Sequence, residues 1–191
     1  MKVGVFGGRF DPVHIGHLIV ASDVRERLGL DRVAFMPSWN PPHKPAEAPW
    51  DDRLRMLQLA LEGVDWAELW TVERELNLPK SYTVDVLTEV KRRRPEAELY
   101  FFLGTDEFAN LPSWHEPERL FELAKVVVLT RAIKTPFHHR FVERALFVPN
   151  RVIEVSSSEI RERMRRGLSI RFLVPEPVRL YILERGLYAG S

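Results

Sequence analysis

Short apolar runs alternate with segments of helical periodicity along this chain, and this alternation constrains the fold more than any other feature. The first apolar run, residues 3–6, is followed by apolar residues at helical spacing that end before Gly29. Strands that alternate with helices in this way form βαβ units, whose strands lie parallel in one sheet. The sequence therefore predicts the α/β class, with a Rossmann-like, doubly wound and mostly parallel sheet.

The remaining elements are predicted by the same criteria. Further strands are expected at residues 32–37, 99–103 and 126–130, with a weaker one at 68–72 and one more from 146–148 and 152–155. Helices are expected behind an N-cap at Asp51 or Asp52, from Thr83 onward, and through most of residues 156–191. These C-terminal helices are expected to pack onto the sheet. Because neither an internal repeat nor a linker is evident, one domain is predicted over residues 1–191.

Composition excludes several classes of protein. The chain has 191 residues, of which 45% are hydrophobic, and 28 Lys and Arg balance 27 Asp and Glu. This near-neutral charge predicts neither nucleic acid nor a membrane surface as partner. The absence of Cys excludes disulfides, thiolate zinc sites and cysteine nucleophiles. A soluble cytoplasmic protein is expected, and the sequence leaves a homo-oligomer open.

The densest chemical signal lies between the first predicted strand and the first predicted helix. In open α/β sheets, ligands bind beyond the carboxyl ends of the strands, and a helix N-terminus offers N–H groups and partial positive charge to phosphates. Two glycines there allow a nucleotide to approach the backbone, and His14 and His17, three residues apart, can face one pocket. The segment reads Gly7-Gly8-Arg9-Phe10-Asp11-Pro12-Val13-His14-Ile15-Gly16-His17.

Other interpretations of this segment are weaker. Taken singly, the two glycines could form only a turn, and each histidine could be only a polar cap. A metal site built from Asp11, His14 and His17 lacks a further ligand at suitable spacing, so no metal ligands are predicted. The chain has neither a Walker pattern nor Gly-x-Gly-x-x-Gly, which argues against a P-loop kinase and a standard dinucleotide-binding dehydrogenase.

A second candidate anion site lies at residues 156–161, which read Ser-Ser-Ser-Glu-Ile-Arg. Ser156 and Glu159 have capping-box spacing, which explains two of these residues without any ligand. It does not explain three consecutive hydroxyls with Arg161 in the first turn, where the helix dipole favours acids. A phosphate cradle is therefore predicted here. Arg163, Arg165 and Arg166 are expected to be surface charges.

Together these segments resemble the nucleotidyltransferases with the signatures (H/T)xGH and SSTxIR, and most closely the bacterial nicotinate-nucleotide adenylyltransferases. The closer resemblance depends on further blocks, which are residues 40–44 (NPPHK), 81–87 (SYTVDVL), 103–106 (LGTD) with Trp114, and 173–188. These blocks cover nearly the whole chain in the family's order. One block alone would be weak, whereas several in register are specific.

The resemblance implies transfer of AMP from ATP to nicotinate mononucleotide, which yields deamido-NAD and pyrophosphate in NAD biosynthesis. Mg²⁺, bound mainly through the ATP phosphates, is the implied cofactor. The acceptor phosphate would attack the α-phosphorus in line, so the protein needs to position two anions and to neutralise charge. This requirement agrees with a sequence that offers anion cradles but no nucleophile paired with a base.

Site residues follow from the resemblance position by position. His14, His17 and Arg161 are expected to be catalytic, with His17 near the α-phosphate. The full set expected to contact ATP is Gly7, Gly8, Arg9, Phe10, His14, His17, Gly104, Asp106, Ser157, Ser158 and Arg161. The set expected to contact nicotinate mononucleotide is Asn40, His43, Lys44, Thr83, Trp114 and Arg131. Trp114 would stack on the pyridine ring, and Thr83 would address its carboxylate.

The sequence departs from the family pattern at three positions. Arg9 stands where Thr or Ser is usual, which puts that residue's usual phosphate or backbone contact in doubt. Ile15 replaces a frequent Asn, and Ser158 replaces Thr while keeping the hydroxyl. Little change is expected from Ser158.

Three alternatives remain open from the sequence. Another adenylyltransferase of the superfamily, such as phosphopantetheine adenylyltransferase, or a cytidylyltransferase, would lack the His-Lys loop and the Ser-Tyr-Thr block. A class I aminoacyl-tRNA synthetase would need a tRNA-reading portion for which the chain has no length. A non-catalytic nucleotide-binding or nucleic-acid-binding module would bind ligand without turnover.

Overall fold

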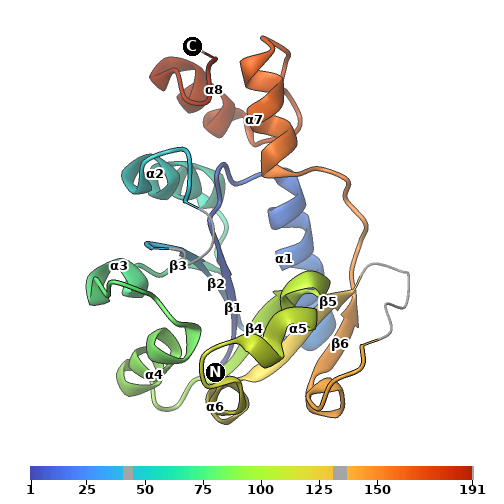
Figure 1. The fold of residues 1–191 in the computed structure, drawn as a ribbon. Helices are drawn as coiled ribbons and strands as arrows, with labels where there is room; N and C mark the ends of the chain where they lie inside the picture. The colour runs from blue at the N-terminus through green and yellow to red at the C-terminus, as the bar shows by residue number, and fades with distance from the viewer. Residues whose placement is uncertain (41–44, 131–136, 191) are drawn as a thin grey trace.

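The computed structural model describes residues 1–40, 45–130 and 137–190 and contains a six-stranded sheet in the order β3-β2-β1-β4-β5-β6 (Figure 1). Every neighbouring pair of strands is parallel. The predicted fold class is therefore confirmed. The strands are β1 (Lys2–Gly8), β2 (Arg32–Pro37), β3 (Ala67–Leu69), β4 (Glu98–Gly104), β5 (Lys125–Thr130) and β6 (Leu146–Pro149).

Helices connect successive strands, as the alternation of patterns predicts. In the described part of the chain, no helix is both long enough and apolar enough to cross a membrane. The helices are α1 (Ile15–Leu28), α2 (Trp50–Leu61), α3 (Val72–Leu76), α4 (Thr83–Arg93), α5 (Thr105–Asn110), α6 (Pro117–Leu123), α7 (Ser157–Arg165) and α8 (Glu176–Arg185), with short 3₁₀ turns at Leu111–Ser113 and Val142–Arg144.

The two faces of the sheet carry separate apolar clusters. Successive side chains of a strand point to opposite faces, so β2 contributes Val33 and Phe35 to one cluster and Ala34 and Met36 to the other. Helices α1 and α2 cover the first face, and α3 to α6 cover the second. Continuous apolar runs in β4 and β5 follow from burial on both faces.

The two C-terminal helices lie beyond the end of the sheet at which β1 terminates (Figure 1). Their buried side chains, among them Ile160 and Val178, join the same apolar cluster as Met56 and Leu57 of α2. Helix α8 packs directly against α2. This packing places the start of α7 next to the loop that follows β1.

Three local predictions are wrong. The cap of α2 is Pro49, and the two aspartates lie inside the first turn, where acids suit the helix dipole. The strand predicted at 68–72 ends at Leu69, because Val72 already begins α3. Residues 152–155 form no strand, because the chain here leaves the edge of the sheet and runs toward α7 (Figure 1).

The strand order reverses between β1 and β4. The chain proceeds from β1 outward through β2 to β3 and then returns to β4 on the other side of β1. Loops that leave the carboxyl ends of β1 and β4 therefore diverge, and open α/β sheets bind their ligands at such a point. The two Gly-containing segments identified in the sequence, residues 7–17 and 103–106, lie at this point.

Gly29 ends α1 in the left-handed conformation, with φ of 59°, and its N–H donates to Glu26 O. We expect Gly29→Ala to lower the free energy of unfolding by about 1 kcal/mol, because a Cβ is unfavourable at this backbone conformation. Gly29→Asn should lose less, because Asn tolerates the left-handed region. Urea unfolding of the three proteins measures this, and equal losses for Ala and Asn would contradict it.

Candidate active site

His14 and His17 form the centre of the candidate site. His14 is the N-cap residue of α1, and His17 lies in its first turn. Their imidazole rings stack, with centroids 3.7 Å apart, and the His14 N–H donates to His17 Nδ1 at 3.1 Å. The predicted placement of both rings at the α1 N-terminus is therefore what the structure has.

Both imidazoles are neutral near pH 7. Burial lowers the pKa of His14 to about 4. Burial, and then the neighbouring His14, lower the pKa of His17 well below its usual value. Because His17 Nδ1 accepts a hydrogen bond, the proton of the neutral ring is assigned to Nε2. His17 therefore presents an N–H donor without carrying a charge.

Gly16 is required by the position of the His14 ring. A Cβ at residue 16 would lie 2.9 Å from His14 Cε1 and Nδ1, closer than such atoms approach. His14 Nδ1 itself is buried and has no hydrogen-bond partner among the described residues. A buried nitrogen in this state is stabilised when a ligand atom pairs with it.

The start of α7 lies against the loop after β1. Ser156 caps the helix by accepting from Glu159 N at 3.1 Å, which confirms the cap predicted by its spacing. Ser157 Oγ donates to Pro12 O at 2.8 Å, and Arg161 Nη1 donates to Asp11 O, also at 2.8 Å. The structure thus brings together the two segments that the sequence identified as separate anion cradles.

A buried carboxylate organises the surrounding loops. Asp11 is 1% exposed, and its Oδ2 accepts from Glu47 N at 2.7 Å. Its Oδ1 accepts from Ala48 N at 3.1 Å and from the Tyr188 hydroxyl at 2.7 Å. Asp11 therefore acts as a structural acceptor that joins the proline-rich loop, which comprises residues 38–50, and the C-terminal segment to the first motif, residues 7–17.

Arg53 of α2 extends this buried network. Its side chain donates to Arg9 O at 2.7 Å and to Ser38 O at 2.9 Å. Arg53 is 2% exposed. These bonds satisfy the carbonyls of the residues that directly follow β1 and β2. The backbone at Arg9 is therefore held in place independently of the Arg9 side chain.

The acceptor-side residues come from three segments. Asn40 Nδ2 donates to Leu78 O at 3.2 Å, which ties the proline-rich loop to the chain before α4. Thr83 is the first residue of α4, and Trp114 follows the 3₁₀ turn after α5. The rings of Tyr82 and His115 stack with centroids 4.3 Å apart. This stack brings the chain at Thr83 next to the chain at Trp114.

The buried carboxylate of Glu73 supports the proline-rich loop from below. Glu73 Oε1 accepts from Trp39 N at 2.9 Å, and burial raises the pKa of this carboxyl above its usual value. A cavity of about 580 Å³ opens beside this loop, with Asn40 and Lys80 in its wall. The volume is large enough for a small molecule.

The other predicted contacts are placed as follows. Gly7 and Gly8 end β1, Gly104 ends β4, and Asp106 is exposed in the first turn of α5. Phe10 has a buried ring, which packs on Phe6 and His17, so it is part of the core. Only its backbone is available to a nucleotide. Three predicted residues, His43, Lys44 and Arg131, lie outside the described residues.

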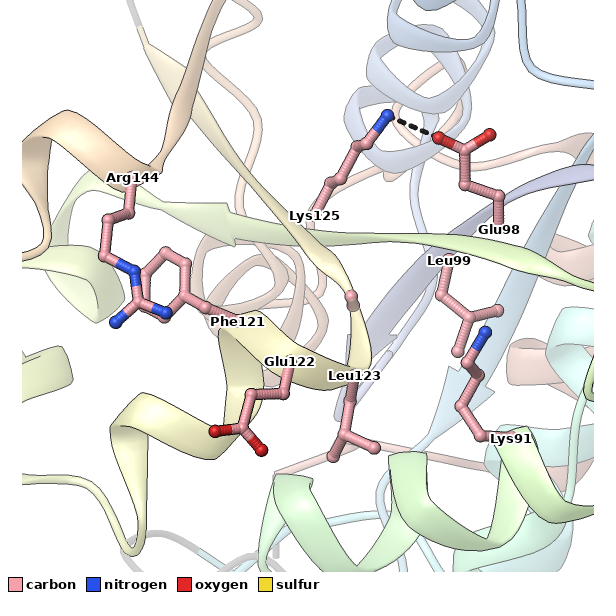
Figure 2. Close-up of a pocket in the computed structure, with 9 residues that line it drawn as sticks. Lys91, Glu98, Leu99, Phe121, Glu122, Leu123, Lys125 and Arg144 are labelled. Carbon is pink, nitrogen blue, oxygen red and sulfur yellow. Dashed lines mark hydrogen bonds and ion pairs between the residues drawn. The ribbon is translucent and has the colours of Figure 1, made fainter.

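Figure 2 shows a second pocket, which lies at the amino ends of β4 and β5. Its volume is about 480 Å³. Its wall includes the start of β4 and the start of β5, where Lys125 pairs with Glu98. Ligands of open α/β sheets bind at the carboxyl ends of the strands, and this pocket lies at the amino ends. We therefore assign it no part in the site.

Sequence reasoning gave no role to several residues that shape the site. The sequence suggests no role for Asp11 beyond that of a metal ligand, and it identifies Tyr188 only as part of the block at residues 173–188. Arg53, Glu47 and Glu73 carry no sequence signal, because a buried charge on a helix is not distinguishable from a surface charge by spacing. The role of Arg53 is recognised from its burial in α2, which the structure shows.

The chain is similar to known proteins over nearly its whole length. A model of the cytidylyltransferase-like family matches residues 5–163. A protein of Geobacillus kaustophilus described as a probable nicotinate-nucleotide adenylyltransferase is 44% identical, with 99% of this chain and 87% of that protein covered. One of Thermus thermophilus with the same description is 43% identical, with 98% and 100% covered.

A solved structure supports the same fold. The nicotinic acid mononucleotide adenylyltransferase of Plasmodium falciparum, complexed with NaAD, superposes with a TM-score of 0.79. The superposition covers 98% of this chain and 97% of that one, at 20% sequence identity. At that identity the likeness concerns the fold alone.

The depressed pKa of His14 predicts a pH dependence of stability. The unfolded chain takes up a proton at an ordinary histidine pKa of 6.5, whereas folded His14 does so only at about 4. Between these values the unfolded state binds more protons, so folding stability falls as pH is lowered. We expect the wild type to lose about 1 kcal/mol more than His14→Asn between pH 6 and pH 5.

Urea unfolding of both proteins at pH 7, 6 and 5 measures this difference. The comparison cancels the carboxylates that the two proteins share. Parallel stability curves would mean that His14 titrates like an exposed histidine.

Proposed function

The chain belongs to the cytidylyltransferase-like family, and we propose how its site performs the reaction of the nicotinate-nucleotide adenylyltransferases. The enzyme transfers AMP from ATP to nicotinate mononucleotide and forms deamido-NAD and pyrophosphate in NAD biosynthesis. The single observation that carries the proposed mechanism is the neutral, stacked pair of histidines, which directly follows the loop whose Asp11 and Pro12 carbonyls bind Arg161 and Ser157 of α7.

The reaction needs position and charge more than it needs a protein nucleophile. A phosphate oxygen of the mononucleotide forms a bond to the α-phosphorus of ATP, while the bond from that phosphorus to the β-bridging oxygen breaks. Pyrophosphate leaves with the electron pair. An enzyme accelerates this reaction by holding the attacking and the leaving oxygen in line and by directing hydrogen-bond donors at the charged oxygens.

His17 is proposed to donate from Nε2 to an oxygen of the transferring α-phosphate. The bond from His14 N to Nδ1 fixes both the tautomer and the orientation of this ring. A donor oriented before the reaction stabilises charge that develops in the transition state without reorganising. His14, with its unpaired Nδ1, is proposed to contact the same phosphates.

Ser157, Ser158 and Arg161 are proposed to bind the β- and γ-phosphates. Arg161 keeps its guanidinium in place by donating to Asp11 O and to Ser158 Oγ, the latter at 3.3 Å. A guanidinium has five N–H donors in a fixed plane, so these bonds leave donors for phosphate. The adenosine is proposed to lie along Gly7, Gly8 and Gly104, with Asp106 accepting from ribose hydroxyls.

The mononucleotide is proposed to bind between the proline-rich loop and the Thr83–Trp114 pair. Trp114 would stack on the pyridine ring, and Thr83 would address the carboxylate. Asn40, His43, Lys44 and Arg131 are proposed to meet its phosphate, the last three on the basis of sequence resemblance alone.

Divalent metal is a common requirement of this family, and we propose Mg²⁺. Among the described residues, no three His, Asp or Glu side chains gather as a metal site would require. We propose that the ion is held mainly through the ATP phosphates. The proposal takes residues 1–191 as one domain that acts in the cytoplasm.

His17→Ala should lower kcat by about 10²-fold or more, because a donor to the transferring phosphate is lost. His138→Ala is the matched control, since His138 is exposed and follows β5, outside the two motifs that form the proposed ATP site. Circular dichroism should show both variants folded. A kcat near the wild-type value for His17→Ala would refute the role of His17.

Pyrophosphate release tests the reaction itself. With ATP and Mg²⁺, we expect turnover that strongly favours nicotinate mononucleotide over nicotinamide mononucleotide and phosphopantetheine. Turnover only with another acceptor would keep the ATP site and overturn the acceptor assignments. ATP binding without turnover on any acceptor would indicate a nucleotide-binding module.

A further inference from the structure

Glu47, on the proline-rich loop, places its carboxylate between two arginines of α7. Its Oε1 accepts from Arg161 Nε at 3.0 Å. Arg165 Nη2 lies 2.6 Å from Oε1 and 2.5 Å from Oε2. Arg161 and Arg165 are four residues apart, so they lie on one face of the helix and can hold one anion between them.

The loop does not need this carboxylate to stay in place. The backbone N–H groups of Glu47 and Ala48 are held by the buried Asp11 carboxylate. The Glu47 side chain is 44% exposed, whereas that of Arg161 is only 11% exposed. The carboxylate can therefore rotate into solvent without moving the loop, and Arg161 stays where it is.

A phosphate group matches the position of this carboxylate. Guanidinium groups bind carboxylates and phosphates through the same paired N–H donors. Arg161 also donates from Nη2 to Ser158 Oγ, so the anion that binds its Nε lies next to the serines at the start of α7. Of the two arginines, Arg165 faces this anion from one helical turn further along.

We propose that Arg165 is a further binding residue for the terminal phosphates of ATP, and that Glu47 is the internal anion which these phosphates displace. The inference rests on the proposed function, because it takes Arg161 as a ligand of the pyrophosphate part of ATP. It gives Arg165 a role that spacing alone does not, since the sequence predicts a surface charge there. The triphosphate outcompetes the carboxylate because it carries more negative charge.

The first test removes the negative charge of Glu47, which competes with the phosphates for the two arginines. Glu47→Gln should bind ATP and pyrophosphate about fivefold more tightly than the wild type, because an exposed ion pair of this kind contributes on that scale. AMP, which lacks the β- and γ-phosphates, should bind unchanged. Isothermal titration calorimetry at fixed salt measures all three ligands.

Glu162→Gln is the matched control for this variant. It removes the same charge, and Glu162 pairs with Arg165 at 3.7 Å without bonding to Arg161. Its affinity for ATP should stay within about twofold of the wild type. An equal gain in the two variants, an equal gain for AMP, or weaker ATP binding in Glu47→Gln would each overturn the inference.

The second test removes the arginine. Arg165→Ala should weaken ATP and pyrophosphate about fivefold and leave AMP unchanged, while Arg166→Ala, one residue further along at the end of α7, should change none of them. Equal losses in the two variants would leave only the general charge of the helix and would overturn the role of Arg165.

Different measurements test the proposed function and the roles of Glu47 and Arg165. Pyrophosphate release with nicotinate mononucleotide reports on the proposed function, whereas the binding differences report on Glu47 and Arg165. Wild-type turnover with no difference between Glu47→Gln and Glu162→Gln would refute the inference alone. Absence of both turnover and ATP binding in the wild type would refute both.

Discussion

The buried carboxylate of Asp11 is the interaction on which the rest of the site depends. A carboxylate that is 1% exposed must be hydrogen-bonded, because leaving it unpaired away from water costs several kcal/mol. Its partners are two backbone N–H groups at Glu47 and Ala48 and the hydroxyl of Tyr188. One side chain therefore couples the first motif to the proline-rich loop and to the last turn of the chain.

This coupling explains why the site can be built from loops. Loops are usually more mobile than the elements they join. Here Arg53, also buried, holds the carbonyls of Arg9 and Ser38, while Arg161 holds that of Asp11. The proposed catalytic groups are thus attached to backbone that buried charges hold in place, which lowers the cost of ordering that backbone on binding. Pre-organisation of this kind is what a reaction without a protein nucleophile requires.

Much of the fold could be predicted from the sequence, because its elements depend on local pattern. The runs at 32–37 and 126–130 gave strands with correct or nearly correct bounds, and Gly29 ended its helix as expected. Short helices such as α3, α5 and α6 were missed, since five to seven residues are too few to establish a period. The strand predicted at residues 152–155 is absent for another reason. Their apolar pattern is that of a strand, but this segment connects β6 to α7.

The candidate site likewise contains some residues that the sequence identifies and others that it does not. Residues adjacent in the sequence, such as the two histidines of α1 and the serines of α7, could be recognised from spacing. Partners that are distant in sequence could not, because Asp11 meets Tyr188 only after the C-terminal helices have packed on α2. The roles of Arg53 and Glu73 likewise depend on burial, which spacing does not encode.

The neutral state of the two histidines is important for the proposed catalysis. A charged imidazole would attract ATP more strongly in the ground state, but uniform binding does not accelerate the chemical step. A neutral donor interacts weakly with the ground-state phosphate and more strongly as charge moves onto the oxygens. Burial makes this possible by lowering the pKa of both rings, while Arg161, held by Asp11 O, is proposed to supply the fixed positive charge next to the leaving group. In the proposed mechanism the charge that binds the phosphates is thus separate from the donor that acts in the transition state.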